Sequence, residues 1–112
     1  MAQIRQKPVA QKDEKSDGDP WYRDQVRLLP CCVCEAFDMQ QLSPTTLHHV
    51  IHDRFGTLRT PDRNAIPLCD GHHQGDRDTS KTAIHRGKVT WRGKYGPDHG
   101  FTAATQRKIL GG

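Results

Sequence analysis

Residues 68–73 read LCDGHH, and residues 31–34 read CCVC. Each stretch contains two zinc-ligand side chains that are separated by two residues. This spacing places both ligands on one turn of the chain, which suits half of a tetrahedral zinc site. Together the two stretches predict a site of three cysteines and one histidine with no open coordination position, which is typical of structural zinc. The four predicted ligands are Cys31, Cys34, Cys69 and His72.

The composition favours a metal that stabilises the fold. Only 33% of the 112 residues are hydrophobic, and a single domain with so small a core usually needs a metal, a disulfide or a partner. Structural zinc contributes about 10–16 kcal/mol in zinc-finger peptides, which matches or exceeds the usual net stability of a domain. The alternatives are a disulfide framework or four unrelated side chains. Cys32 is left over, and we interpret it as a small buried hydrophobe rather than as an alternative ligand.

The sequence gives no indication of a membrane protein or of secretion. The longest apolar stretch, residues 28–34, has seven residues and contains Pro30, whereas a bilayer span needs about 20. Residues 1–20 lack the apolar region of a signal peptide. We therefore expect a cytoplasmic protein, where cysteines in this spacing bind metal more often than they form disulfides.

The net charge of +4 lies entirely in the C-terminal part of the chain. Residues 1–24 carry five basic and five acidic side chains, and residues 25–112 carry twelve basic and eight acidic ones. Such a balance favours a polyanionic partner, with an ordinary solvated basic face as the alternative. The candidate phosphate contacts near the Cys/His stretches are Arg54, Arg59, Arg63 and Arg77.

We expect an α+β domain at residues 21–112, preceded by a flexible N-terminal arm at residues 1–20, which is polar and poor in large apolar side chains. A short helix or strand is expected over 21–29, with Trp21, Val26 and Leu28 facing inward. Expected strands cover 45–51 and 65–68. Expected helices or helical turns cover 71–79, 80–85, 89–95 and 102–110, the last one stopped by two glycines.

Three histidines remain near the predicted zinc ligands. His48 and His49 lie on an expected strand, where neighbouring side chains point to opposite faces, so one of them can bind a metal while the other faces elsewhere. His73 directly follows a zinc ligand, which would hold it rigidly. A lone histidine is more often structural, but these three together indicate a second metal site beside the first. The remaining His52 and His99 are expected to face solvent.

The order of these motifs resembles that of the HNH endonucleases, the ββα-metal or His-Me finger family, in its zinc-knuckle form. The resemblance rests on LHHVI at 47–51, on Asn64 five residues before the second zinc knuckle, and on LCDGHH at 68–73. It covers residues 31–85. The segments HHQG at 72–75, IHRG at 84–87 and KYG at 94–96 resemble the branch that includes phage recombination-associated nucleases.

This resemblance implies a small ββα-metal domain that is stapled by structural zinc and carries short flanking helices. It implies that His48 and His73 are ligands of a catalytic divalent metal, that His49 is the general base, and that Asn64 orients this base. His85 matches a further histidine of the branch and is either a third metal ligand or a surface histidine. His48 stands where Asp is commoner, and its neutral, softer nitrogen favours transition metals.

The implied activity is hydrolysis of DNA phosphodiester bonds by a water that His49 deprotonates, since histidine is the usual general base near neutral pH. The implied cofactors are structural Zn²⁺ and a catalytic Mg²⁺, Mn²⁺ or other divalent ion. DNA is the expected partner, a recombination or replication protein is a further candidate, and the expected setting is the cytoplasm of a bacterial or phage-infected cell. The alternative function is a non-catalytic zinc module that binds nucleic acid or protein. A cysteine-based redox protein is disfavoured because no βαβ context surrounds the cysteines.

Overall fold

The fold is built on two antiparallel strands, β1 (Thr45–His48) and β2 (Ile66–Cys69), and the helix α3 (Asp70–His73) follows β2 directly. The computed structural model describes residues 18–53 and 60–111. The other α-helices are α1 (Pro20–Arg27), α2 (Cys32–Ala36), α4 (Lys88–Tyr95) and α5 (Thr102–Leu110). Three short 3₁₀ helices connect them: η3 (Asp62–Asn64), η4 (Ile84–Arg86) and η5 (Asp98–Phe101). The expected α+β class is confirmed.

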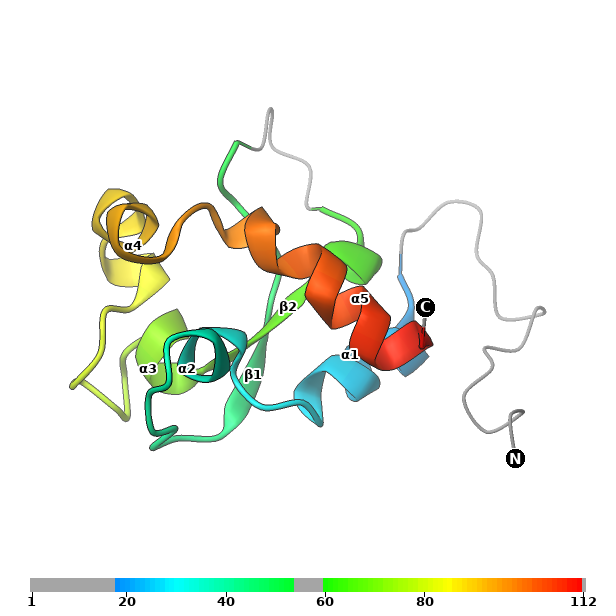
Figure 1. Ribbon diagram of the computed structural model, residues 1–112, viewed down its shortest axis with the longest axis horizontal. Coiled ribbons are helices and arrows are strands. Elements are labelled where there is room, and N and C mark those ends of the chain that lie inside the picture. Colours follow the sequence, from blue (N-terminus) through cyan, green and yellow to red (C-terminus); the bar gives the residue numbers. More distant parts are fainter. Residues whose placement is uncertain (1–17, 54–59, 112) are drawn as a thin grey trace.

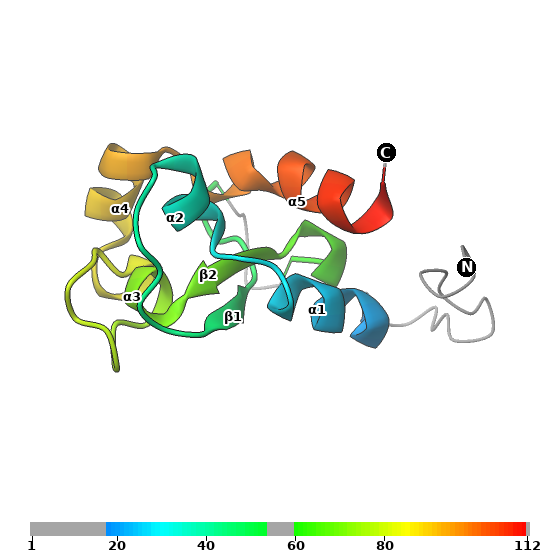
Figure 2. The ribbon, with the colours of Figure 1, turned by 60° about the horizontal axis from the view of Figure 1, so that its bottom comes forward.

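The two strands pair from Thr45 opposite Cys69 to His48 opposite Ile66. Side chains alternate along a strand, so Thr46 and His48 share one face of β1. Figures 1 and 2 show α3 and α1 at opposite ends of this sheet, with α2 close to α3. The elements that carry cysteine and histidine therefore gather at one end of the molecule.

The larger hydrophobic cluster packs β2 against α2 and α4. Trp91 is fully buried in it, and its indole N–H donates a hydrogen bond to the carbonyl of His72 at 3.1 Å. Its ring meets that of Tyr95 edge-on, with 5.2 Å between the centroids, as expected for one face of a helix. The buried members are Cys31, Val33, Cys34, Val50, Ile66, Leu68, Cys69, Ile84 and Trp91.

A second, smaller cluster joins α1 to α5. Its buried members are Tyr22, Val26 and Ile109. The prediction that Val26 faces inward is confirmed, but the same prediction for Leu28 is wrong, because Leu28 is 77% exposed. Positions four apart share a helix face, so Tyr22 and not Leu28 lies on the buried side with Val26.

Asp19 and Pro20, which were expected to lie in the N-terminal arm, belong to the folded part of the chain. Asp19 is 3% exposed, and its carboxylate caps α1 by accepting a hydrogen bond from the amide of Tyr22. The same carboxylate accepts a hydrogen bond from Nε of Arg63 at 2.9 Å. The expected arm at 1–20 is therefore too long at its C-terminal end, because a helix N-terminus needs a polar cap. The rest of that arm, residues 1–17, lies outside the described residues.

Several expected elements differ in length. The strand expected over 45–51 ends at His48, and the helix expected over 71–79 ends at His73. The carboxylate of Asp70 accepts the backbone N–H groups of Arg77 and Asp78, which folds the chain back after one helical turn. The helix expected over 102–110 is confirmed as α5, and Gly111 ends it in the left-handed conformation. Within the described part of the chain, every helix is too short or too polar to cross a membrane.

Candidate metal centres

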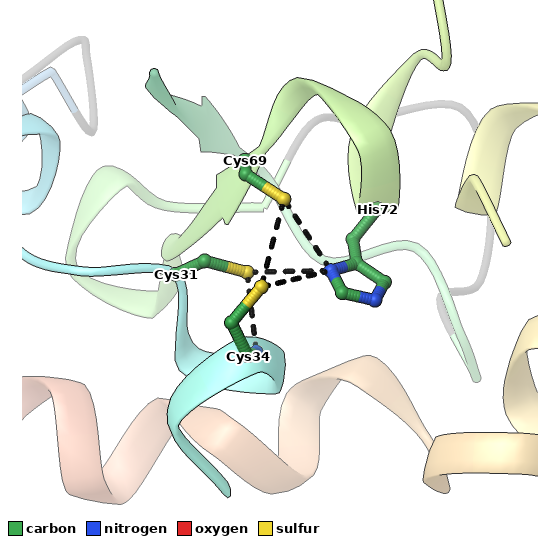
Figure 3. Close-up of side chains that lie close together, drawn as sticks. All are labelled: Cys31, Cys34, Cys69 and His72. Atoms are coloured by element: carbon green, nitrogen blue, oxygen red, sulfur yellow. Dashed lines mark hydrogen bonds between the residues drawn. The ribbon is translucent and has the colours of Figure 1, made fainter. Parts of the chain in front are cut away.

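The two knuckles meet at the end of the sheet. Cys31 is the N-cap of α2 and Cys34 lies in its first turn. Cys69 ends β2, and His72 lies one turn further along in α3. All four side chains are buried, and their ligand atoms lie within 4.8 Å of one another (Figure 3). We call this group the Cys3His cluster.

The spacing of the donor atoms fits a tetrahedral zinc site. Zinc–sulfur bonds of about 2.3 Å and zinc–nitrogen bonds of about 2.05 Å place tetrahedral ligands about 3.8 Å apart for S···S and about 3.5 Å apart for S···N. The Sγ atoms of Cys34 and Cys69 are 3.9 Å apart. The Nδ1 atom of His72 lies 3.5, 3.6 and 3.4 Å from the Sγ atoms of Cys31, Cys34 and Cys69. The Cys3His cluster can therefore hold a metal ion such as zinc.

The surroundings of the cluster fix its ligands. The ring of His72 stands edge-on to that of Tyr95, with 5.3 Å between centroids, and its Nδ1 atom points at the sulfurs (Figure 3). Interaction with Cys31 and, beyond it, with His72 lowers the pKa of the Cys69 thiol, although burial opposes the change. A lowered thiol pKa favours the thiolate, which is the form that binds metal.

Cys32 does not belong to this group. It is partly buried and packs against the larger hydrophobic cluster. Burial raises the pKa of its thiol to about 12, so it stays protonated near neutral pH. This placement agrees with its interpretation as a small hydrophobe.

A second group brings His48, His73 and His85 together from β1, α3 and η4. Their ligand nitrogens also lie within 4.8 Å of one another. The ring centroids are 5.0 Å apart for His48 and His73, 5.4 Å for His48 and His85, and 4.9 Å for His73 and His85. His48 and His73 are buried, whereas His85 is exposed. We call this group the three-histidine cluster.

Hydrogen bonds outside the cluster decide which nitrogen of each buried ring is free. The hydroxyl of Thr46 donates to the carbonyl of Leu68 at 2.7 Å, so its oxygen accepts the Nδ1–H of His73 at 2.7 Å. The Nε2–H of His48 donates to Oδ2 of Asp98 at 2.8 Å. The unprotonated atoms are then Nε2 of His73 and Nδ1 of His48. Metal-ligating histidines commonly have such a partner on their other nitrogen.

The surroundings of His73 and His85 favour their neutral forms. Burial, together with the neighbouring His48 and His85, lowers the pKa of His73 to about 4. Burial and then His48 lower the pKa of His85 as well. Neutral imidazole is the form that binds metal, so the lowered pKa values favour His73 and His85 as ligands.

Asp98 holds this end of the sheet together. Its buried carboxylate also accepts the backbone N–H groups of Ile51 and His52, at 2.7 and 3.1 Å. Although burial opposes the change, the hydrogen bonds from His48 and these amides keep the pKa of Asp98 below its usual value. Asp98 was not among the predicted site residues, because nothing in its spacing from His48, fifty residues earlier, marks it.

His49 points to a different partner from His48, as the strand alternation predicts. Its Nε2–H donates to Oδ1 of Asp62 at 2.6 Å. The sequence predicted that Asn64 orients this ring, but the carboxylate that contacts it belongs to Asp62. The described hydrogen bonds of Asn64 are made by its main chain, with Pro61 and with the hydroxyl of Thr102.

The two remaining histidines outside the clusters were expected to face solvent. His99 is exposed and donates a hydrogen bond to Asp53 at 2.8 Å. His52 is buried, so the expectation is wrong for this residue. Its ring accepts the backbone N–H of Asp98 and donates to the carbonyl of Lys88, so both nitrogens are used inside the fold.

The four arginines predicted to contact phosphates differ in their surroundings. Arg54 and Arg59 lie outside the described residues. Arg77 is exposed. Arg63 is 43% exposed but is tied to Asp19, and its guanidinium lies 5.4 Å from the ring centroid of Tyr22.

The two clusters and the His49–Asp62 pair are the features from which a function can be argued. His49 follows His48 directly in the chain, and it is close enough to the three-histidine cluster to be among the groups that lower the pKa of His73. Comparisons of the chain with family models, with curated proteins and with solved structures found no match.

Proposed function

We propose that this chain is a metal-dependent endonuclease of the HNH type that hydrolyses phosphodiester bonds of DNA. The observation that carries the proposal is a division of labour between adjacent histidines. The ring of His48 belongs to the three-histidine cluster, while the ring of His49 is held by a separate carboxylate. A metal ligand and a positioned base next to each other are what metal-assisted hydrolysis requires.

In this proposal β1, β2 and α3 form the ββα-metal unit of the family. His48, His73 and His85 hold a divalent cation, and the Cys3His cluster holds structural zinc. When bound, the divalent cation supplies Lewis-acid stabilisation of the negative charge that develops on phosphate and leaving-group oxygens. Three nitrogen donors suit Mn²⁺, Zn²⁺ or another transition metal better than Mg²⁺, which prefers oxygen ligands.

His49 acts as the general base on the attacking water. Its side chain is 17% exposed, so one edge of the ring is accessible while Nε2 is engaged with Asp62. The accessible nitrogen is then Nδ1, which has no proton in this arrangement and can accept one. Exposed basic side chains such as Arg77 would contact the phosphate backbone and add affinity without sequence information.

The test is nicking of supercoiled plasmid DNA by the full chain with Mg²⁺, Mn²⁺ or Zn²⁺, and with chelator. His49→Ala should abolish nicking while the zinc content and the far-UV circular dichroism spectrum stay unchanged. The matched control is His99→Ala, which removes an exposed histidine that lies outside both clusters and should leave nicking intact. Nicking by His49→Ala at the wild-type rate would show that the assignment of the base is wrong.

The alternative is a non-catalytic zinc module that binds nucleic acid or protein. This alternative predicts that the wild-type chain does not cut DNA with any of these metals, whether or not it binds DNA. The three-histidine cluster favours the enzyme, because a binding module needs no histidines beyond its zinc ligands.

A further inference from the structure

The carboxylate of Asp62 lies between His49 and the N-terminus of α1. Its side chain is 0% exposed. Oδ1 accepts the Nε2–H of His49 at 2.6 Å, and Oδ2 accepts the backbone N–H of Asp19 at 2.7 Å and a guanidinium N–H of Arg23 at 2.5 Å. Three donors, two from the N-terminal end of α1 and one from His49, therefore converge on one buried carboxylate.

We propose that Asp62 is a positioning residue that fixes both the orientation and the tautomer of His49. This inference rests on the proposed function, because the tautomer that Asp62 selects matters only if His49 acts as a general base. It assigns to Asp62 the role that the sequence had suggested for Asn64.

The tautomer follows from the chemistry of the partner. An ionised carboxylate can only accept hydrogen bonds, so the proton of a neutral His49 ring sits on Nε2. Burial of Asp62 opposes ionisation, but the hydrogen bonds from His49, Asp19 and Arg23 hold its pKa below the usual value. The lone pair is thereby left on Nδ1, the nitrogen that must take a proton from water.

The second oxygen makes the arrangement rigid. Oδ2 is held by Asp19, which is the N-cap of α1, and by Arg23 in the same helix. The carboxylate therefore cannot turn toward His49 or away from it without breaking contacts to α1. Because Asp62 is fixed, the ring of His49 loses little conformational freedom when the substrate binds. Such preorganisation favours catalysis.

Asparagine at position 62 distinguishes this role from simple packing. The amide has nearly the same shape as the carboxylate but a single acceptor oxygen. Two donors, from Asp19 and Arg23, compete for that oxygen on one side, so the amide NH₂ turns toward His49. The ring must then accept at Nε2 and carry its proton on Nδ1, which is the wrong tautomer for a base at Nδ1. An equivalent replacement in the serine protease triad lowers kcat by about 10⁴-fold through the same tautomer error.

The experiment compares Asp62→Asn with Arg23→Gln, each in the full chain with zinc bound. Arg23→Gln removes a donor to Oδ2 but leaves the contact between Asp62 and His49. We expect Asp62→Asn to lower kcat for nicking about 100-fold or more with little change in KM, whereas Arg23→Gln, which loosens the carboxylate but keeps the tautomer of His49, should lower kcat only about tenfold or less. Equal losses of kcat in the two variants would mean that Asp62 only holds α1 in place, and would overturn the inference.

A second readout does not depend on activity. Nitrogen-15 NMR of the imidazole rings, with His49 identified by its absence from the spectrum of His49→Ala, reports which ring nitrogen carries the proton. The wild type should be protonated at Nε2 and Asp62→Asn at Nδ1. A wild-type ring protonated at Nδ1 overturns the inference even if Asp62→Asn fails to fold.

The two proposals can fail separately. A wild-type chain that nicks DNA, together with an inactive His49→Ala and a fully active Asp62→Asn, would reject the role of Asp62 and keep the nuclease. A wild-type chain that cuts DNA with none of the metals would reject the nuclease, and with it the catalytic use of the pair, whatever tautomer NMR reports.

Discussion

The two clusters lie on neighbouring elements, but they differ in donor chemistry and in access to solvent. In the Cys3His cluster all four ligands are buried, and the donor spacing leaves no open position on a tetrahedral ion. In the three-histidine cluster two ligands are buried and His85 is exposed, and the donors are three nitrogens only. A closed site can contribute stability but cannot bind a substrate, whereas a site with only three ligands, one of them exposed, leaves positions for water and phosphate.

The largest expected effect comes from opening the closed site. Cys34→Ala removes one sulfur and leaves three partners without a full coordination shell. Structural zinc supplies about 10–16 kcal/mol in comparable peptides, so the variant should lose zinc and unfold or aggregate. The measurements are zinc content and circular dichroism.

The control for this variant is Cys32→Ala, because Cys32 packs against the larger hydrophobic cluster and lies outside the Cys3His cluster. It should keep its zinc and lose at most a few kcal/mol of stability from the smaller side chain. A soluble, active Cys34→Ala protein would contradict the structural role of the Cys3His cluster.

The next largest effect comes from the buried ligand of the open site. His73→Ala should retain the structural zinc and the fold, because His72 and not His73 faces the sulfurs. It should lose binding of a second divalent ion in calorimetric titrations, and nicking should fall at least about 100-fold. Loss of the structural zinc in this variant would mean that the two clusters are not independent.

A smaller effect is expected from the carboxylate behind the open site. Asp98→Asn weakens the contact that fixes the ring of His48, and such changes usually lower metal affinity about 10- to 100-fold. Because Asp98 also accepts two backbone N–H groups, stability should fall by about 1–3 kcal/mol. Calorimetric titration with Mn²⁺ and urea unfolding measure the two effects separately, and unchanged Mn²⁺ affinity would show that Asp98 supports only the backbone.

The smallest effect is expected from the exposed ligand. His85→Ala should weaken binding of the divalent ion about tenfold, and nicking should recover when the metal concentration is raised, because His48 and His73 remain. The measurement is the metal dependence of the nicking rate. An unchanged dependence would identify His85 as a surface histidine, which is the alternative that its sequence position left open.

Features that depend on residues close together in the sequence were predictable, whereas features that depend on distant residues were not. The four members of the Cys3His cluster were all predicted, because two-residue spacings are local and thiol and imidazole side chains have few other reasons to share them. The helix at 102–110 was predicted for a similar reason, since its stop signal adjoins it. Of the residues expected to face inward near α1, Val26 is buried but Leu28, just past the end of the helix, is exposed, because an eight-residue helix carries too little periodicity to fix where it ends.

The hydrogen-bond partners of His48 and His49 could not be predicted from neighbouring residues in the sequence. Asp62 lies 13 residues from His49, and Asp98 lies 50 residues from His48. Both are on short 3₁₀ helices, and neither has a spacing that distinguishes it from an ordinary surface aspartate. Asn64 stands at the position that the family motif favours, but the turn of η3 brings the carboxylate of Asp62, two residues earlier, into contact with the ring of His49.

The sequence by itself determined the Cys3His set, because ligand type and two-residue spacing are written along the chain, and it indicated a second set of histidines. Only the tertiary structure decided which nitrogen of each ring is free, which carboxylates hold the rings and that Asp19 belongs to the fold. Those properties depend on hydrogen bonds between segments that the strand pairing and the packing of α1 and η5 bring together, and a buried carboxylate accepts whatever donors the fold delivers to it.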